Sequence, residues 1–122
     1  VMILSFVAEG AGVSQFLLFG IGPTLAASGV SGVLADPKIR LVNANNGAVV
    51  SSNDNWKNHP SAGLTAQFLT QQGLTISDLD AAMVLDLGAG RYSLVVEGAD
   101  GGTGVALGGV QKVLLATGGI TP

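Results

Sequence analysis

Cysteine is absent from this sequence, and charged and aromatic side chains are scarce. Because none of the 122 residues is a cysteine, disulfides and thiolate metal sites are excluded. Only 11% of the residues are charged, against about 25% in ordinary soluble domains. A single tryptophan and a single tyrosine offer little of the aromatic surface on which sugars stack. These shortages leave an unusually apolar chain and weigh against a glycan site.

The few charged residues are not arranged for binding nucleic acid. The formal net charge is −3 and the sequence pI is near 4.7. Contact with phosphates requires basic side chains gathered into a stripe or patch. The basic residues are instead scattered along the chain, at Lys38, Arg40, Lys57, Arg91 and Lys112. We therefore expect no nucleic-acid partner.

The apolar composition does not indicate a transmembrane segment. Hydrophobic residues make up 48% of the chain, and the mean hydropathy is +0.54. The longest apolar stretch, 16–35, has the length of a spanning helix, but four glycines and Pro23 interrupt it. No basic segment precedes it, as would be typical of a signal peptide. We expect the apolar surface to be covered by a partner molecule instead.

Glycines divide the chain into short apolar runs. A chain of this length is expected to form one domain, here residues 1–122. Eight runs of four to seven residues are bounded by turn-forming residues, which predicts an all-β, antiparallel sandwich or barrel of about eight short strands, with the sandwich favoured. The predicted strands are 2–8, 16–21, 38–43, 48–52, 81–87, 91–97, 104–107 and 110–116.

Three glycine-containing segments are predicted to be tight turns between strands. Asn45-Asn46-Gly47 supplies the positive φ angles that a hairpin needs. Gly88-Ala89-Gly90 and Asp100-Gly101-Gly102 are expected to join strands in the same way.

Two segments are predicted to be helical. Residues 23–27 begin with proline and precede Gly29, which is typical of a short helical turn. Residues 61–72 place Leu64, Phe68 and Leu69 at helical spacing, with Gly73 as a stop signal.

Five segments together resemble a known family. They are LLFGIGPTL at 17–25, GVSGVLADP at 29–37, SNDNW at 52–56, LGAGRYSLVV at 87–96 and GTGVAL at 102–107. In this order they resemble a repeat domain common in large bacterial cell-surface and secreted proteins. The middle of the chain is similar to the bacterial pre-peptidase C-terminal β-sandwich. The resemblance implies a jelly-roll-like sandwich outside the cell and no enzymatic activity. Phe19 and Asn55 depart from the family, which usually has Arg and Asp at these positions.

The polar cluster that follows the 48–52 strand is a candidate calcium site. Asn53, Asp54 and Asn55, with Asp36, could supply the oxygen ligands that calcium prefers. The spacing of an EF-hand loop is absent, and Asn55 removes a charge. The favoured alternative is a turn in which these side chains bond to nearby backbone and Trp56 packs over the sheet edge. We expect no cofactor, with calcium as the alternative.

Two sets of residues resemble catalytic groups. His59 with Asp54 and Ser51 or Ser52 would have the composition of a hydrolytic triad, but all lie on one loop without a nucleophile elbow. We therefore expect no enzyme.

Asp78, Asp80 and Asp86 share one parity of an extended strand and could act as paired carboxylates. A solvated polar face is the favoured interpretation of these three residues.

The first and last apolar runs carry no charge. Exposed strand edges are normally protected by Lys, Pro or bulges. We therefore expect identical subunits to associate by β-strand addition, and a non-closing contact of this kind makes a filament. The residues expected to take part are Met2, Ile3, Leu4, Phe6, Val7, Phe19, Val113, Leu114, Leu115 and Ile120.

Two functions therefore remain open. The favoured one is a structural subunit of an extracellular bacterial filament or surface assembly, with contacts to a surface or matrix. The alternative is a monomeric extracellular adhesion or binding module that recognises calcium or glycan.

Overall fold

The structure is a computed structural model and describes residues 2–71, 73, 75–99 and 101–113. Its main feature is one antiparallel sheet, which confirms the all-β class. The strands are β1 (Met2–Ile21), β2 (Pro37–Asn43), β3 (Val49–Asn53), β4 (Ala81–Gly98) and β5 (Leu107–Val113). The helices are α1 (Pro23–Ala27), the 3₁₀ turn η1 (Trp56–Asn58) and α2 (Ala62–Gln71). None of the helices in this part of the chain is both long and apolar enough to cross a membrane.

The strands are fewer and longer than predicted, because two pairs of predicted runs merge: 2–8 and 16–21 join in β1, and 81–87 and 91–97 join in β4. The strand predicted at 104–107 is wrong, since only Leu107 belongs to β5 and Val105 forms an isolated bridge with Val33. The predicted turn at Gly88-Ala89-Gly90 is wrong: these residues lie within β4, where Gly88 pairs with Val13 and Gly90 with Ala8 on the two sides of a bulge. Glycine weakens and bends a strand without ending it when a partner strand continues on the other side.

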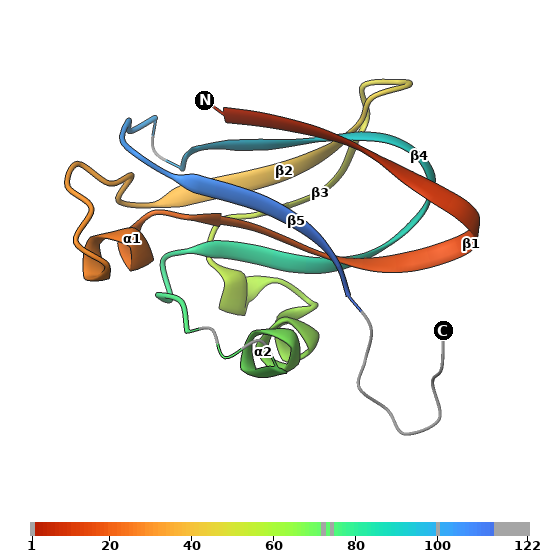
Figure 1. Cartoon of the computed structure of the whole chain (residues 1–122). Coiled ribbons are helices and arrows are strands. Elements are labelled where there is room, and N and C mark those ends of the chain that lie inside the picture. The colour runs from red at the N-terminus through yellow and green to blue at the C-terminus, as the bar shows by residue number, and fades with distance from the viewer. Residues whose placement is uncertain (1, 72, 74, 100, 114–122) are drawn as a thin grey trace.

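β1 and β4 together form the spine of the sheet. The strand order is β3-β2-β4-β1-β5, and β1 and β4 pair along nearly their whole lengths. A bulge between Ala8 and Val13 interrupts their register, and there the two strands bend back over the core (Figure 1). The hydroxyl of Tyr92 donates to the Gly88 oxygen at 2.9 Å across the bend of β4. Its ring stacks on Phe6 with centroids 5.6 Å apart.

The core lies inside the curled sheet. Side chains alternate between its two faces, so every second residue of each strand points inward. The inner cluster comprises Ala8, Phe16, Leu18, Ile39, Leu41, Ala81, Met83, Leu87, Tyr92, Leu94 and Val96. A second cluster joins Leu17 and Val84 to Phe68 of α2 on the outer face. This helix explains why residues 16–19 and 81–84 are apolar without alternation, since both faces of the sheet are covered there.

The local predictions away from the merged strands are confirmed. α1 begins at Pro23, and α2 lies within the predicted 61–72 segment. The loop 44–48 joins β2 to β3, with Gly47 at φ +73° and its N–H donating to the Asn43 oxygen at 2.7 Å. Such local signals depend on few residues and survive in the tertiary structure.

Candidate functional site

The polar segment 51–61 lies along the outer edge of the first half of β4. The Asn53 side-chain oxygen accepts from the Ala82 N–H at 3.0 Å, and the Ser61 hydroxyl oxygen accepts from the Val84 N–H at 3.0 Å. Between them, the Trp56 N–H donates to the Asp80 backbone oxygen at 3.0 Å. These side chains occupy the hydrogen-bonding groups that a further strand would otherwise use. The segment therefore caps this edge of the sheet.

The side chain of Asn53 is fully used in that cap. Its amide nitrogen donates to the Asn55 oxygen at 2.9 Å, while its oxygen receives the Ala82 N–H. The contact two residues along the chain agrees with the predicted turn, although the side chain donates rather than accepts. Asn53 is buried, so both polar ends of its amide are satisfied inside the protein.

Two oxygen atoms of the predicted calcium cluster remain without a hydrogen-bond partner. Asp54 Oδ1 and Asn55 Oδ1 are buried and unpaired among the described residues, as is the indole nitrogen of Trp56. Asp36 lies elsewhere, ahead of β2, where its backbone oxygen accepts from the Ala99 N–H at 2.9 Å. Within the described ranges, no three His, Asp or Glu residues gather as metal ligands.

His59 and Ser51 meet, but not in the arrangement of a hydrolytic triad. His59 Nε2 lies 3.0 Å from Ser51 Oγ, and His59 Nδ1 accepts from the Ser61 N–H at 3.0 Å. Because Nδ1 accepts, the ring proton is on Nε2 and is donated to Ser51. A triad requires the opposite tautomer, in which Nε2 takes the serine proton and Nδ1–H faces a carboxylate. The imidazole is therefore held as a structural link between β3 and the start of α2.

Burial also favours the neutral form of His59. Desolvation lowers the pKa of His59 below its ordinary value of 6.5. The Ser61 hydroxyl lies 2.7 Å from Nδ1, and the backbone N–H of Ser61 points at the same nitrogen. A proton on Nδ1 would face the Ser61 N–H, and two donors pointing at each other repel. This geometry therefore also lowers the pKa of His59, as burial does.

The three aspartates that share one parity in the sequence do not share a face. Asp80 is fully buried, Asp86 is exposed on β4, and Asp78 forms a surface ion pair with Lys57 at 2.8 Å. The prediction of a solvated polar face is therefore wrong for Asp80. Residues 78–80 form a turn rather than a strand, so the parity argument did not apply to them.

Asp80 holds three segments together through its carboxylate. Oδ1 accepts from the Gly22 N–H at 2.8 Å, and Oδ2 accepts from the Ser77 N–H at 2.9 Å and from the Thr24 hydroxyl. A buried carboxylate is tolerated because these donors replace its hydration. The sequence analysis named Asp80 as a candidate paired carboxylate but missed its buried structural role, for which the only signal was an acidic residue directly before a long apolar run.

The residues predicted to mediate self-association fall into separate groups. Met2, Leu4 and Phe6 point inward and pack on the core, whereas Ile3 and Val7 point outward and are 63% and 57% exposed. Phe19 packs on the cluster beneath α2, and Val113 is the last residue of β5. Leu114, Leu115 and Ile120 lie outside the described residues.

Three strand edges have no backbone partner among the described residues, and one of them is the outer edge of β3, which pairs with β2 alone. Residues 2–8 of β1 pair with β4 on one side only. β5 pairs with residues 15–21 of β1 on one side only. These edges contrast with the first half of β4, which the 51–61 segment caps.

Comparison of the chain with protein-family models, with curated proteins and with solved structures finds no match. Its function is therefore inferred from the strand edges and the capping segment.

Removal of the Asp80 carboxylate is expected to destabilise the fold severely. Asp80→Ala leaves the buried N–H of Gly22 and the N–H of Ser77 without this acceptor, so the free energy of unfolding should fall by about 3 kcal/mol or more. Asp86→Ala, at an exposed position, should change it by no more than about 0.5 kcal/mol. Urea denaturation measures both, and equal effects would contradict the structural role of Asp80.

The stability of the protein is expected to depend on pH through His59. The pKa of His59 is lowered in the folded state, so just below pH 6.5 the unfolded chain binds more protons than the folded one. The contribution is present in full above pH 6.5 and is lost as the pH falls below that value. The free energy of unfolding is measured by denaturation above and below this pH for the native chain and for His59→Gln. It should change less with pH in the variant, and an identical change in both proteins would refute the role of His59.

Proposed function

We propose that this chain is a non-enzymatic structural subunit of an extracellular bacterial filament or surface assembly. Identical subunits associate by β-strand addition and burial of apolar surface. The proposal includes the jelly-roll-like sandwich and the extracellular location that the resemblance to pre-peptidase C-terminal domains implies. The observation that carries it is the unpaired edge at residues 2–8 of β1.

This edge has the features of a surface that receives another strand. From Met2 to Ala8 it contains no charged residue, and Glu9 is the first charge. Monomeric sheets normally protect such an edge with Lys, Pro or a covering segment. Ile3 and Val7 are large apolar side chains on the outer face of the same segment. An incoming strand would gain main-chain hydrogen bonds from the edge and apolar contacts from these residues.

The protection of the first half of β4 supports this interpretation. Asn53 and Ser61 occupy the outer N–H groups of Ala82 and Val84, so the first half of β4 cannot accept a strand. The fold therefore protects one edge with polar side chains. No side chain among the described residues does the same for residues 2–8.

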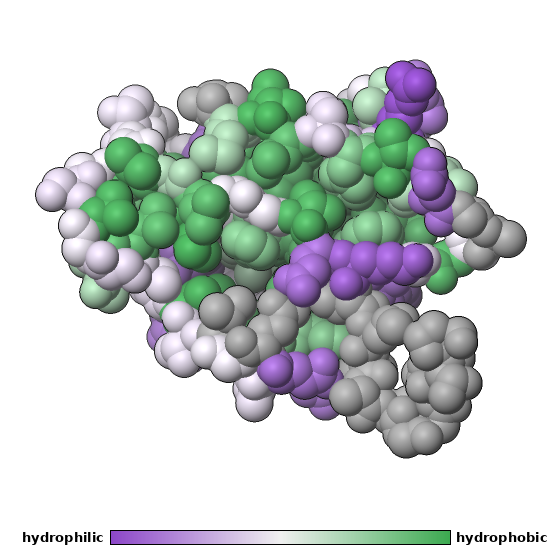
Figure 2. Space-filling model, in the orientation of Figure 1, coloured by the Kyte–Doolittle hydropathy of each residue, from purple (hydrophilic) through white to green (hydrophobic). Residues whose placement is uncertain are grey.

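The apolar surface extends beyond this edge. Figure 2 shows apolar side chains spread over the face that carries β5 and the first half of β1. Val30, Val105 and Leu107 are among the exposed large apolar residues, with 37%, 49% and 49% of their surface accessible. Monomeric soluble proteins rarely expose large contiguous apolar patches, and such a patch usually marks an interaction site.

A second candidate function is a monomeric adhesion or binding module that recognises calcium or glycan, and one observation favours calcium. The buried oxygens Asp54 Oδ1 and Asn55 Oδ1 have no hydrogen-bond partner among the described residues. Carboxylate and amide oxygens are ligands that calcium accepts. A bound cation would supply a partner for such an oxygen.

Lysines on the outer face of β1 are expected to prevent assembly. Ile3→Lys with Val7→Lys places two charges beside the unpaired edge, so filaments seen by negative-stain microscopy should disappear. Val49→Lys with Val50→Lys, at exposed positions of β3, should leave them intact. Circular dichroism checks that both variants keep the sheet. A native chain that stays a uniform monomer at high concentration would contradict the proposed assembly.

Calcium is expected to raise the melting temperature only if the second function holds. A ligand that binds the native state alone stabilises it, so excess calcium should increase Tm of the native chain. Asp54→Asn should abolish the increase, whereas Asp86→Asn should retain it. An unchanged Tm with calcium argues against the calcium-binding module.

A further inference from the structure

Two of the unpaired edges lie beside each other. Residues 2–8 of β1 and 107–113 of β5 border a strip that we name the β1–β5 seam. A Cβ placed on Gly108 would lie 2.7 Å from Leu4 Cδ1 and 3.3 Å from Met2 Sδ. Contact across the seam is therefore made by side chains, and no hydrogen bond between described residues joins the two edges.

The two edges run in the same direction. The beginning of β5 lies beside Met2, which lines one cavity together with Ala106. The end of β5 pairs with Gln15 and Phe16 near the bend, and the Phe16 ring lies 5.8 Å from that of Phe6. A strand of opposite direction between the edges would be antiparallel to both and would continue the pattern of the sheet.

The core is incompletely covered along this seam. Met2, Leu4 and Phe6 on one side and Val110 on the other are only half-buried, although all pack on the inner cluster. Other side chains of the same cluster are fully buried, among them Ile39, Leu41, Met83 and Leu94. An inserted strand would cover the apolar side chains that the seam leaves accessible.

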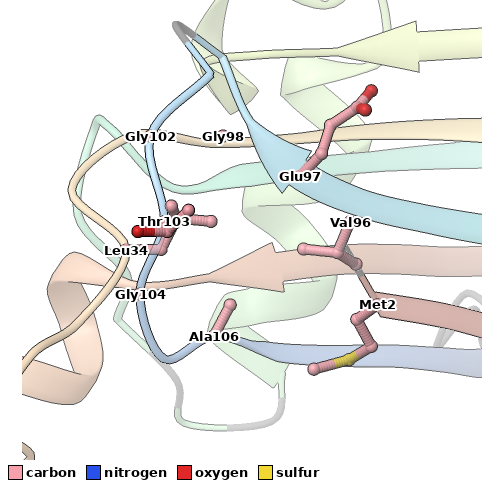
Figure 3. Close-up of a pocket in the computed structure, with 9 residues that line it drawn as sticks. All are labelled: Met2, Leu34, Val96, Glu97, Gly98, Gly102, Thr103, Gly104 and Ala106. Carbon is pink, nitrogen blue, oxygen red and sulfur yellow. The ribbon is translucent and has the colours of Figure 1, made fainter.

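The seam ends in a cavity of about 230 Å³. Figure 3 shows Met2, Val96 and Ala106 around this space, while the Glu97 side chain points away from it. Glycines at 98, 102 and 104 line the remaining wall. The cavity can therefore accept a bulky apolar side chain at this end of an inserted strand.

We propose that residues 114–120 of one copy insert into the β1–β5 seam of a second copy, antiparallel to both edges. This inference rests on the proposed filament function and deepens it by naming the donor segment and the acceptor. The donor has seven residues, as many as the edge 2–8, and carries no charge. Insertion moves Leu4 away from Gly108 and separates the two edges to about twice the usual strand spacing of roughly 4.8 Å.

The side chains of donor and acceptor match in this register. Leu114 falls opposite Ala8, Ala116 opposite Phe6, Gly118 opposite Leu4 and Ile120 opposite Met2, all on the inner face. In the first three pairs a large residue meets a small one, and Gly118, the smallest, lies where Leu4 contacts Gly108. Ile120 and Met2 are both large, and Ile120 lies at the cavity that Met2 lines.

A second copy is a better donor than the same chain. Residue 114 follows the end of β5 at the bend, so the chain would have to reverse there to enter its own seam. A hairpin turn takes at least about two residues. That turn would consume Leu114 and Leu115 and leave five residues, 116–120, to pair. A neighbouring copy can supply all seven residues.

Disulfide formation in this cysteine-free chain tests the register directly. Ser5 lies on the outer face of β1, and Thr117 would lie opposite it in the inserted strand. Chains carrying Ser5→Cys are mixed with chains carrying Thr117→Cys and oxidised under assembly conditions. A disulfide needs Cα atoms within about 7 Å. The yield of mixed dimers should therefore be at least about tenfold higher than in a control in which Ser52→Cys, at an exposed position on β3, replaces Ser5→Cys.

The outcomes separate this inference from the function on which it rests. Preferential cross-linking between the two kinds of chain supports insertion. Filaments without that cross-link overturn the inference but leave the filament function standing. If a chain that carries both substitutions forms the disulfide within one monomer, its own residues fill the seam. That outcome also overturns the inference. No assembly at all overturns both.

Two neighbouring glycines provide a matched test of which side chains point inward. Gly118→Val adds bulk opposite Leu4, and overpacking there should raise the concentration needed for assembly about tenfold or more. Gly119→Val points outward and should change it by less than about threefold. Sedimentation measures both, and equal effects would overturn the proposed register.

Discussion

The buried carboxylate of Asp80 is the interaction on which the arrangement of this fold depends. It receives the N–H groups of Gly22 and Ser77 and the hydroxyl of Thr24, and so fixes the end of β1 and the start of α1 against the turn before β4. The backbone oxygen of the same residue accepts from Trp56 and places the capping segment. Because β1 and β4 are the spine of the sheet, one buried anion positions both strands and the cap at this end.

From this end the sheet acquires two kinds of edge. The 51–61 segment reaches the first half of β4 because the Trp56 N–H donates to the Asp80 oxygen. The side-chain oxygens of Asn53 and Ser61 then accept from the outward N–H groups of β4. The other side of the curled sheet ends in residues 2–8 and β5, which contact each other through side chains alone. The first half of β4 is thus protected, whereas residues 2–8, β5 and β3 each have one edge without a backbone partner among the described residues.

The sequence predicted those elements whose signals are local. Asn45-Asn46-Gly47, the helix at 61–72 and the turn that begins at Pro23 each depend on a few neighbouring residues, and each is present. The turn expected at Gly88-Ala89-Gly90 failed because β1 pairs across it and keeps β4 continuous. The candidate site was predicted in part: the polar cluster was recognised as a turn, but its contact with β4 and the burial of Asp80 depend on residues far away in the chain.

The sequence by itself determined an all-β domain, its helices and the apolar, uncharged runs near both ends, because composition and short-range patterns decide these properties. Only the tertiary structure decided that Met2, Leu4 and Phe6 face the core while Ile3 and Val7 face outward on an unpaired edge. It also brought Leu4 onto Gly108, more than a hundred positions along the chain, and so created the β1–β5 seam. Pairing between distant strands sets which edges are used and which stay open, and no local pattern encodes that choice.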